Sequence, residues 1–133
     1  TVLWIDKYIR DRTLLWQYIS TADAYVMASR YEGFPVAPIE AMACALPIVA
    51  TNVPGISDIL EGGEESGGFI VPKEDITALA VALETLLDHE EWGRELGKRA
   101  RRRAEECFSL EAIGQQMRQF LFSPIHESSK IKP

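Results

Sequence analysis

Residues 24–51 read AYVMASRYEGFPVAPIEAMACALPIVAT, and this stretch decides the fold. It opens and closes with two short apolar runs, Ala24–Ala28 and Ile48–Thr51, which are typical of buried strands. Ser29–Pro35 between them contains Gly and Pro and predicts a loop, and Pro38 suits the first turn of a helix. This order predicts two parallel strands joined by a right-handed helical crossover.

Further elements follow outward from this unit. Val2–Ile5 and Phe69–Val71 are apolar and β-branched runs that predict two more strands, and Gly62–Gly68 predicts a glycine-rich loop. Apolar residues at helical spacing or capping residues predict the following helices: Thr13–Ser20, Ser57–Leu60, Asp75–Leu87, Glu90–Cys107 and Ser109–Phe122. Buried strands that alternate with helices predict an α/β fold, a Rossmann-like parallel sheet flanked by helices with further C-terminal helices.

The 133 residues amount to one domain's worth of chain. We expect the domain to comprise residues 1–122, with residues 123–133 as a frayed tail. Thr1 stands inside an apolar run without an initiator Met, and four strands are few for a doubly wound sheet. We therefore expect an N-terminally truncated domain that lacks the first strands of its sheet.

Charge and cysteine content indicate which partners and which cellular setting are favoured. A net charge of -6 disfavours nonspecific nucleic-acid binding, and no apolar run approaches a membrane span. Cys44 and Cys107 predict free thiols rather than a disulfide, hence a reducing, cytoplasmic setting, with a peripheral position at the inner face of a membrane as the alternative. The basic run Lys98–Arg103 is offset by neighbouring glutamates, so a solvated helix face is favoured over membrane contact. Trp4, Trp16 and Trp92 are expected to anchor the core or its edge.

The loop after Ala24–Ala28 is the best candidate for a binding site. Ligands of open parallel sheets bind at the carboxyl ends of the strands, and a following helix offers free N–H groups. Glu32 and Glu40 flank this helix start, and such carboxylates suit the hydroxyl groups of a sugar or a ribose. The alternative is a solvated Glu32 and a Glu40 that merely complements the helix dipole.

The sequence Glu32-Gly33-Phe34-Pro35-Val36-Ala37-Pro38-Ile39-Glu40 resembles the E-x7-E signature of family 4 retaining glycosyltransferases. The context agrees in order along nearly the whole chain, in segments 22–30, 44–51, 68–72, 79–80, 99–101 and 108–109. The resemblance implies the GT-B fold, in which two Rossmann-like domains enclose the active site, and it makes this chain part of the C-terminal, nucleotide-sugar-binding domain.

The resemblance also implies roles for the loop. Glu32 would be catalytic, by binding donor-sugar hydroxyls and stabilising an oxocarbenium-like transition state. Glu40 would bind the ribose. The remaining substrate-binding positions are expected to be Gly33, Phe34, Pro35, Val36 and Ala37, whose N–H groups, except at Pro35, would face the sugar and diphosphate. No metal and no cofactor is implied; the substrate is a UDP- or GDP-sugar. His89 and His126 are expected to be surface residues.

This sequence departs from the family pattern at three positions. Pro35 and Ala45 stand where Gly is common, and Asp58 stands where Glu is usual. If position 45 needs a positive φ, its Ala is strained by about 1 kcal/mol. The basic pair that clamps the diphosphate normally lies upstream, and only Lys7 and Arg10 are available here as neighbours of the base.

Two functions follow from the resemblance. The first is the donor-binding part of a retaining, metal-independent hexosyltransferase acting on a glycan, lipid or small molecule, for example in polysaccharide biosynthesis. On this view the acceptor binds an N-terminal domain of the same protein, and the present chain alone is inactive. The second is a nucleotide-sugar-binding module without catalytic activity.

Overall fold

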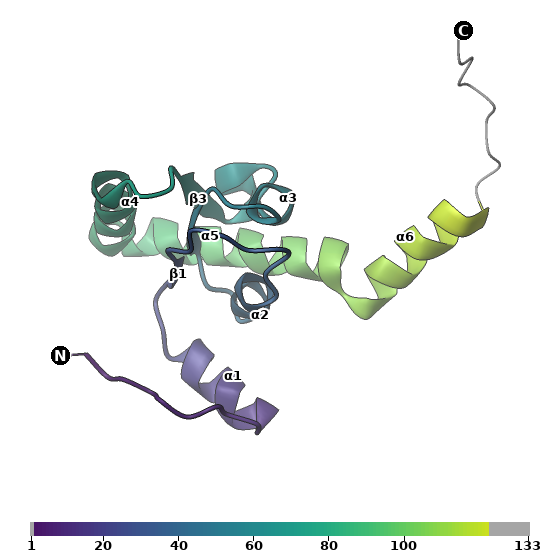
Figure 1. Cartoon of the computed structure of the whole chain (residues 1–133), viewed down its shortest axis with the longest axis horizontal. Helices are drawn as coiled ribbons and strands as arrows, with labels where there is room; N and C mark the ends of the chain where they lie inside the picture. The colour runs from purple at the N-terminus through teal and green to yellow at the C-terminus, as the bar shows by residue number, and fades with distance from the viewer. Residues whose placement is uncertain (1, 123–133) are drawn as a thin grey trace, which may run out of the picture.

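A computed structural model describes residues 2–122 of the chain and contains a three-stranded parallel sheet at its centre (Figure 1). The strands are β1 (Tyr25–Met27), β2 (Ile48–Thr51) and β3 (Gly68–Val71), and their order in the sheet is β1-β2-β3. Tyr25 lies opposite Ile48 in the first pair, and Ile48 lies opposite Gly68 in the second. The prediction of a parallel, Rossmann-like α/β sheet is confirmed.

Helices connect and extend this sheet. Their bounds are α1 (Arg12–Ser20), α2 (Ala37–Ala43), α3 (Ile56–Ile59), α4 (Ile76–Asp88), α5 (Glu90–Arg103) and α6 (Leu110–Phe122), with a 3₁₀ turn at Gly63–Ser66. The segment Glu90–Cys107 is helical as expected, but its last turn, Ala104–Phe108, is π-helical, and the extended Ser109 separates it from α6. Ser109 caps α6 by accepting from the Ala112 N–H at 3.1 Å, as its position in the sequence predicts.

The core has two parts because the side chains of β2 point alternately to opposite faces of the sheet. Ile48 and Ala50 pack with α2, α3 and Ala100 of α5. Val49 faces the other way and packs with Val71, α4 and Leu96 of α5. The sheet is therefore covered on both faces, which is why all four residues of β2 are buried.

Two predictions fail in the N-terminal segment. Val2–Ile5 forms no strand and is exposed, and Trp4 and Trp16 are 82% and 50% exposed rather than anchored in the core. A strand needs a neighbour for its backbone hydrogen bonds, and no described strand pairs with this run. Trp92 does anchor the core edge, with its ring centroid 5.3 Å from that of Phe69. The tail predicted at 123–133 lies outside the described residues.

Helix α5 packs unusually close to the rest of the body through small residues. A Cβ on Gly97 would overlap the carbonyl oxygen of Ala45, and one on Gly67 would overlap Ala100. Ala45 itself has φ 59°, the positive value that its glycine-like position predicts. The turn that ends α2 is thus fixed against α5, and this contact locates the start of β2.

Helix α6 extends away from the body, and Figure 1 shows this clearly. None of its residues is buried. Within residues 2–122, no helix combines the length and apolar character that crossing a bilayer requires.

Candidate active site

The loop of residues 28–36 leaves the carboxyl end of β1 and leads into α2, as the sequence predicts. Thr51, the last residue of β2, holds the loop by donating its hydroxyl to the carbonyl oxygen of Ser29 at 2.5 Å. Ser29 in turn donates its hydroxyl to Oε1 of Glu32 at 2.7 Å. Glu32 is therefore half-buried and oriented rather than freely solvated.

Glu40 lies in the first turn of α2, and its side chain is only 22% exposed. Nη2 of Arg12, at the start of α1, lies 3.0 Å from Oε1 of Glu40. Sequence reasoning pointed to Lys7 and Arg10 and missed Arg12. No local pattern could have identified it, because the pair depends on how the chain between α1 and β1 turns back toward α2.

Tyr25 links the two carboxylates electrostatically. Burial raises the pKa of its hydroxyl above the ordinary 10.0, and the negative charges of Glu32 and Glu40 raise it further. Both glutamates therefore act on one group at the start of β1. The sequence carries a signal for this residue, a polar aromatic side chain in a buried strand next to the loop, which sequence reasoning read only as a strand residue.

The residues between the two glutamates differ in exposure. Pro35 is buried, whereas Gly33, Phe34, Val36 and Ala37 are exposed. A Cβ on Gly33 would meet no atom within 4 Å, so the space beside it is open. Among the described residues, no hydrogen bond occupies the N–H groups of these four exposed residues.

Gly55 supports the loop from behind. It has φ 83°, and a Cβ on it would lie 2.9 Å from the carbonyl oxygen of Gly33 and 3.0 Å from Cδ of Pro35. Only glycine combines this backbone conformation with so close an approach. The start of α3 is therefore packed directly against the loop.

A hollow of about 320 Å³ opens at the carboxyl ends of the strands. It is lined from all three strand ends by Ala28, Ser29, Arg30, Thr51, Glu74, Asp75, Ile76 and Leu79. Arg30 and Glu74 approach to 3.2 Å, and both are largely exposed. Sequence reasoning proposed neither residue for the site. Arg30 directly follows a predicted strand, and Glu74 directly precedes a predicted helix, so their positions could have indicated that they lie at this edge of the sheet.

No group of three or more candidate metal ligands gathers within residues 2–122. His89 is exposed at the end of α4, where its Nδ1 lies 3.0 Å from the carbonyl oxygen of Thr85. His126 lies outside the described residues.

A parallel α/β sheet flanked by helices places the chain in the Rossmann-like class, whose members bind ligands at the carboxyl edge of the sheet. The model of the family described as "Glycosyl transferases group 1" matches residues 7–103, and the chain belongs to this family. It is 32% identical over 111 residues to a capsular polysaccharide biosynthesis glycosyltransferase of Staphylococcus aureus, and this match covers 84% of this chain and 29% of that protein. It is 29% identical over 141 residues to N-acetyl-alpha-D-glucosaminyl L-malate synthase of Bacillus anthracis, over 99% of this chain and 36% of that protein.

Solved structures with the same fold include sucrose-phosphate synthase from Thermosynechococcus elongatus, with a TM-score of 0.70 and 40% identity over 78% of this chain and 26% of that chain. The Anabaena protein HepE in complex with UDP superposes with a TM-score of 0.72 over 81% of this chain and 29% of that chain, at 24% identity. The chain thus has a Rossmann-like α/β fold that matches part of GT-B glycosyltransferases, and it spans less than two thirds of each of these proteins.

Proposed function

We propose that this chain is the donor-binding part of a glycosyltransferase that moves a hexosyl group from a nucleotide sugar, such as a UDP- or GDP-sugar, to an acceptor. The observation that carries the proposal is the pair of half-buried carboxylates, Glu32 and Glu40, on a loop and helix at the carboxyl edge of the sheet, in a chain of this family. Carboxylates only accept hydrogen bonds, so they suit the hydroxyl groups of a sugar and a ribose.

Glu40 is proposed to accept hydrogen bonds from the ribose hydroxyls. Its first-turn position on α2 places it beside the loop, and its ion pair with Arg12 engages Oε1. A carboxylate has several acceptor positions. The ion pair therefore leaves acceptor capacity on Glu40 for a hydroxyl group.

Glu32 is proposed to accept hydrogen bonds from the donor sugar and to stabilise the positive charge that develops on the sugar ring. The hydrogen bond from Ser29 fixes its carboxylate in advance, and preorganised charges are more effective than mobile ones. The free N–H groups of Gly33, Phe34, Val36 and Ala37 are proposed to face the sugar and the diphosphate.

The reaction we propose retains the configuration of the sugar and uses no metal. The bond from the anomeric carbon to the diphosphate breaks, the acceptor oxygen bonds to the same face of that carbon, and a diphosphate oxygen takes the acceptor's proton. We further propose that the acceptor binds a second, N-terminal domain of the same protein. On this proposal the 133-residue chain alone binds the donor and transfers no sugar.

Calorimetric titration of the chain with UDP tests the binding part of this proposal. A hydrogen bond from a hydroxyl to a charged group contributes about 1.5–3 kcal/mol, so Glu40→Gln should weaken UDP binding by about 10-fold or more. Glu84→Gln on the exposed face of α4 is the matched control and should bind UDP as the unmodified chain does. UDP binding that is equal in the Glu40→Gln variant and the control would refute the role of Glu40.

The catalytic part is tested in a protein that joins this chain to an acceptor-binding domain. Loss of one transition-state-stabilising group typically costs about 10²- to 10³-fold in rate. We therefore expect Glu32→Gln to reduce transfer from UDP- or GDP-sugars by about 10²-fold while UDP binding changes little. Transfer at the unmodified rate would exclude catalysis by Glu32. Absence of transfer in every form that still binds UDP would favour a binding module without activity.

A further inference from the structure

We propose that Arg103, at the end of α5, is a positioning residue that holds the loop of Glu32 in place through two separate routes, one along a pair of aromatic rings and one along α3. The inference deepens the proposed function and rests on it, because it concerns the same loop. Arg103 lies far from Glu32 in the sequence, and its side chain is only 19% exposed.

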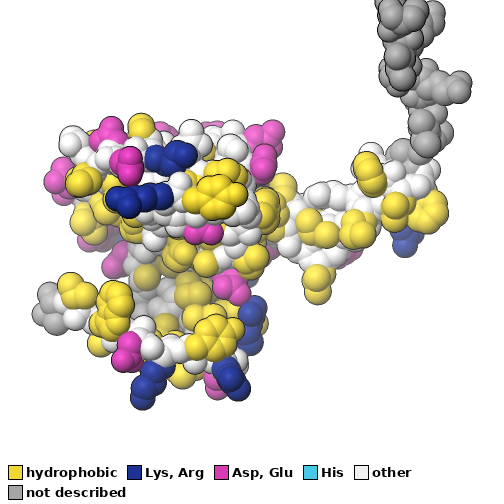
Figure 2. Space-filling view, viewed as in Figure 1, with side chains coloured by type: hydrophobic (Ala, Val, Ile, Leu, Met, Phe, Trp, Pro, Cys, Tyr) yellow, Lys and Arg dark blue, Asp and Glu magenta, His cyan; other side chains and the backbone are white. Residues whose placement is uncertain are grey.

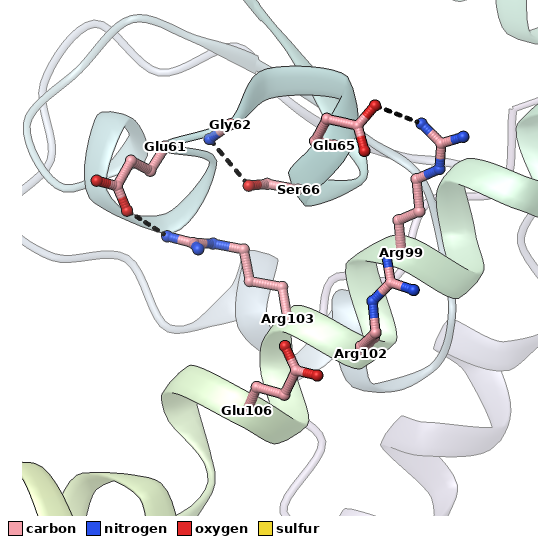
Figure 3. A pocket seen from close by; sticks show the side chains of 8 residues that line it. All are labelled: Glu61, Gly62, Glu65, Ser66, Arg99, Arg102, Arg103 and Glu106. Carbon is pink, nitrogen blue, oxygen red and sulfur yellow. Dashed lines mark hydrogen bonds and ion pairs between the residues drawn. The ribbon is translucent and has the colours of Figure 1, made fainter.

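Arg103 is held by more partners than any other arginine in its neighbourhood. Its Nε donates to the carbonyl oxygen of Ile59 at 2.6 Å, and its Nη2 donates to that of Asp58 at 2.7 Å. Nη2 also lies 3.3 Å from Oε2 of Glu61. Figure 3 shows the Arg103 side chain reaching across to Glu61. These contacts use the planar fork of the guanidinium group, which lysine does not possess.

The first route runs through two aromatic rings. The guanidinium carbon of Arg103 lies 5.8 Å from the ring centroid of Phe108, within the range of a cation–π interaction. The Phe108 ring lies 6.3 Å from that of Phe34, at an interplanar angle of 55°. Tilted rings at this distance attract each other. Phe34 stands two residues after Glu32, so this contact bears directly on the loop.

The second route runs through α3. The carbonyl groups that Arg103 binds belong to Asp58 and Ile59, the last two residues of this one-turn helix. Gly55, immediately before α3, packs against the carbonyl oxygen of Gly33. Arg103 therefore satisfies carbonyl groups at one end of α3 while the other end supports the loop. The two routes meet the loop at adjacent residues, Gly33 and Phe34.

The hollow beside Arg103 does not itself have the charge of an anion-binding site. Its volume is about 430 Å³, and Figure 3 shows the residues that line it, Glu61, Gly62, Glu65, Ser66, Arg99, Arg102, Arg103 and Glu106. Arg103 pairs with Glu61, and Arg99 pairs with Glu65 and Glu95. Three carboxylates and three guanidinium groups line this hollow, and Arg99 and Arg103 are engaged in contacts within the fold.

Arg103→Lys and Phe108→Leu are the variants that test the proposal, and Arg99→Lys is the matched control. Arg99 lines the same hollow from the same helix and forms ion pairs, but it has no contact with α3 or Phe108. NMR order parameters of the backbone N–H groups of residues 32–34, 36 and 37 in the ligand-free folded chain report on the loop, and calorimetry with UDP reports on binding. Thermal unfolding of each variant shows how much overall stability has changed.

We expect Arg103→Lys and Phe108→Leu each to lower these order parameters from about 0.85, the value of a rigid backbone, toward about 0.6 or below. Both variants should weaken UDP binding by about 10-fold, because a tenfold change needs only about 1.4 kcal/mol. Phe108→Tyr keeps the ring face, so its order parameters should equal those of the unmodified chain and its UDP binding should lie within about twofold. Arg99→Lys should likewise leave both measurements unchanged within these limits.

Unchanged order parameters of the loop in both test variants would overturn the proposal, even where the unfolding temperature falls, because Arg103 would then be merely structural. An equal loss of order in Arg99→Lys would overturn it too. Failure of the unmodified chain to bind UDP would refute the proposed function, while the order parameters would still decide the role of Arg103.

Discussion

The hydroxyl of Tyr25 responds to both carboxylates of the candidate site. Burial, and then the charges of Glu32 and Glu40, raise the pKa of its hydroxyl, so the folded chain holds this proton to a higher pH than the unfolded chain does. This difference in pKa contributes to the free energy of unfolding. The contribution is fully present below the unfolded pKa of about 10, and it is lost as the pH rises through the folded pKa.

Tyr25→Phe should therefore lose less stability between about pH 9 and about pH 11 than the unmodified chain, since this variant lacks the hydroxyl whose pKa is raised. Urea unfolding at both pH values measures this. Tyr8→Phe is the control, because the Tyr8 side chain is exposed and its removal should leave the pH dependence unchanged. An identical pH dependence in the Tyr25 and Tyr8 variants would contradict the prediction.

Some residues of the site could be predicted from the sequence and others could not. The places of Glu32 and Glu40 follow from local patterns, because each depends on a strand, a loop or a helix within a few residues. A positive φ at Ala45 follows only from the resemblance, in which glycine is usual at this position, and the structure has φ 59° there. Arg12 and Arg103 reach the site region only through packing between distant elements. Charge alone does not distinguish them from the other arginines of the chain.

At the scale of elements, α5 depends on close approach rather than on helix propensity. Gly97 sits inside α5 against the carbonyl oxygen of Ala45. Gly97→Ala would gain up to about 1 kcal/mol of helix propensity in isolation. The overlap with Ala45 is expected to reverse the sign and destabilise the chain by about 1–3 kcal/mol.

Thermal unfolding checks this expectation, with Gly114→Ala in α6 as the matched control. A Cβ on Gly114 would meet no atom within 4 Å, so this variant should be as stable as the unmodified chain or more stable. If Gly97→Ala raised stability as much as Gly114→Ala, the close packing of α5 on the α2–β2 turn would be disproved.

Element types were easier to predict than element boundaries or partners. Ser109 accepts the capping hydrogen bond expected of it, and β2 has the bounds predicted from its apolar run. Asp75 also caps its helix, by accepting from the Ala78 N–H, although only the helix was predicted there. Val2–Ile5 has the composition of a strand but remains unpaired, because composition does not specify a neighbour. The π-helical turn at Ala104–Phe108 carries no comparable sequence signal, so the sequence predicted a continuous helix to Cys107.

At the scale of the molecule, a contiguous apolar surface lies outside the core. On α6 five exposed apolar side chains fall on one face, at Leu110, Ile113, Met117, Phe120 and Leu121, and Phe122 lies off this face. Figure 2 shows hydrophobic side chains along this helix, away from the compact body. Exposed apolar patches of this kind promote association.

We expect the chain to associate with itself as its concentration rises, and the double variant Ile113→Glu, Phe120→Glu to remain monomeric. Analytical ultracentrifugation measures both. Gln115→Glu, Gln119→Glu adds the same charge to the opposite face of α6 and should associate as the unmodified chain does. The unfolding temperature should change little in either variant, because α6 buries no residue. Equal association of the two double variants would locate the contact elsewhere.

The π-helical turn has a consequence for how this helical segment tolerates insertions and deletions. A π turn adds one residue to an α-helix without ending it, and each residue corresponds to about 100° around the axis. Removing one residue from Ala104–Cys107 would restore a regular helix up to Phe108 and rotate the Phe108 side chain by about 100° around the axis of α5. Phe108 would then no longer face both Arg103 and Phe34. Ser109 has an extended backbone and caps α6 as a separate helix, so this cap would be kept. A substitution here changes one side chain, whereas a single-residue deletion would turn every side chain between the deletion and Ser109.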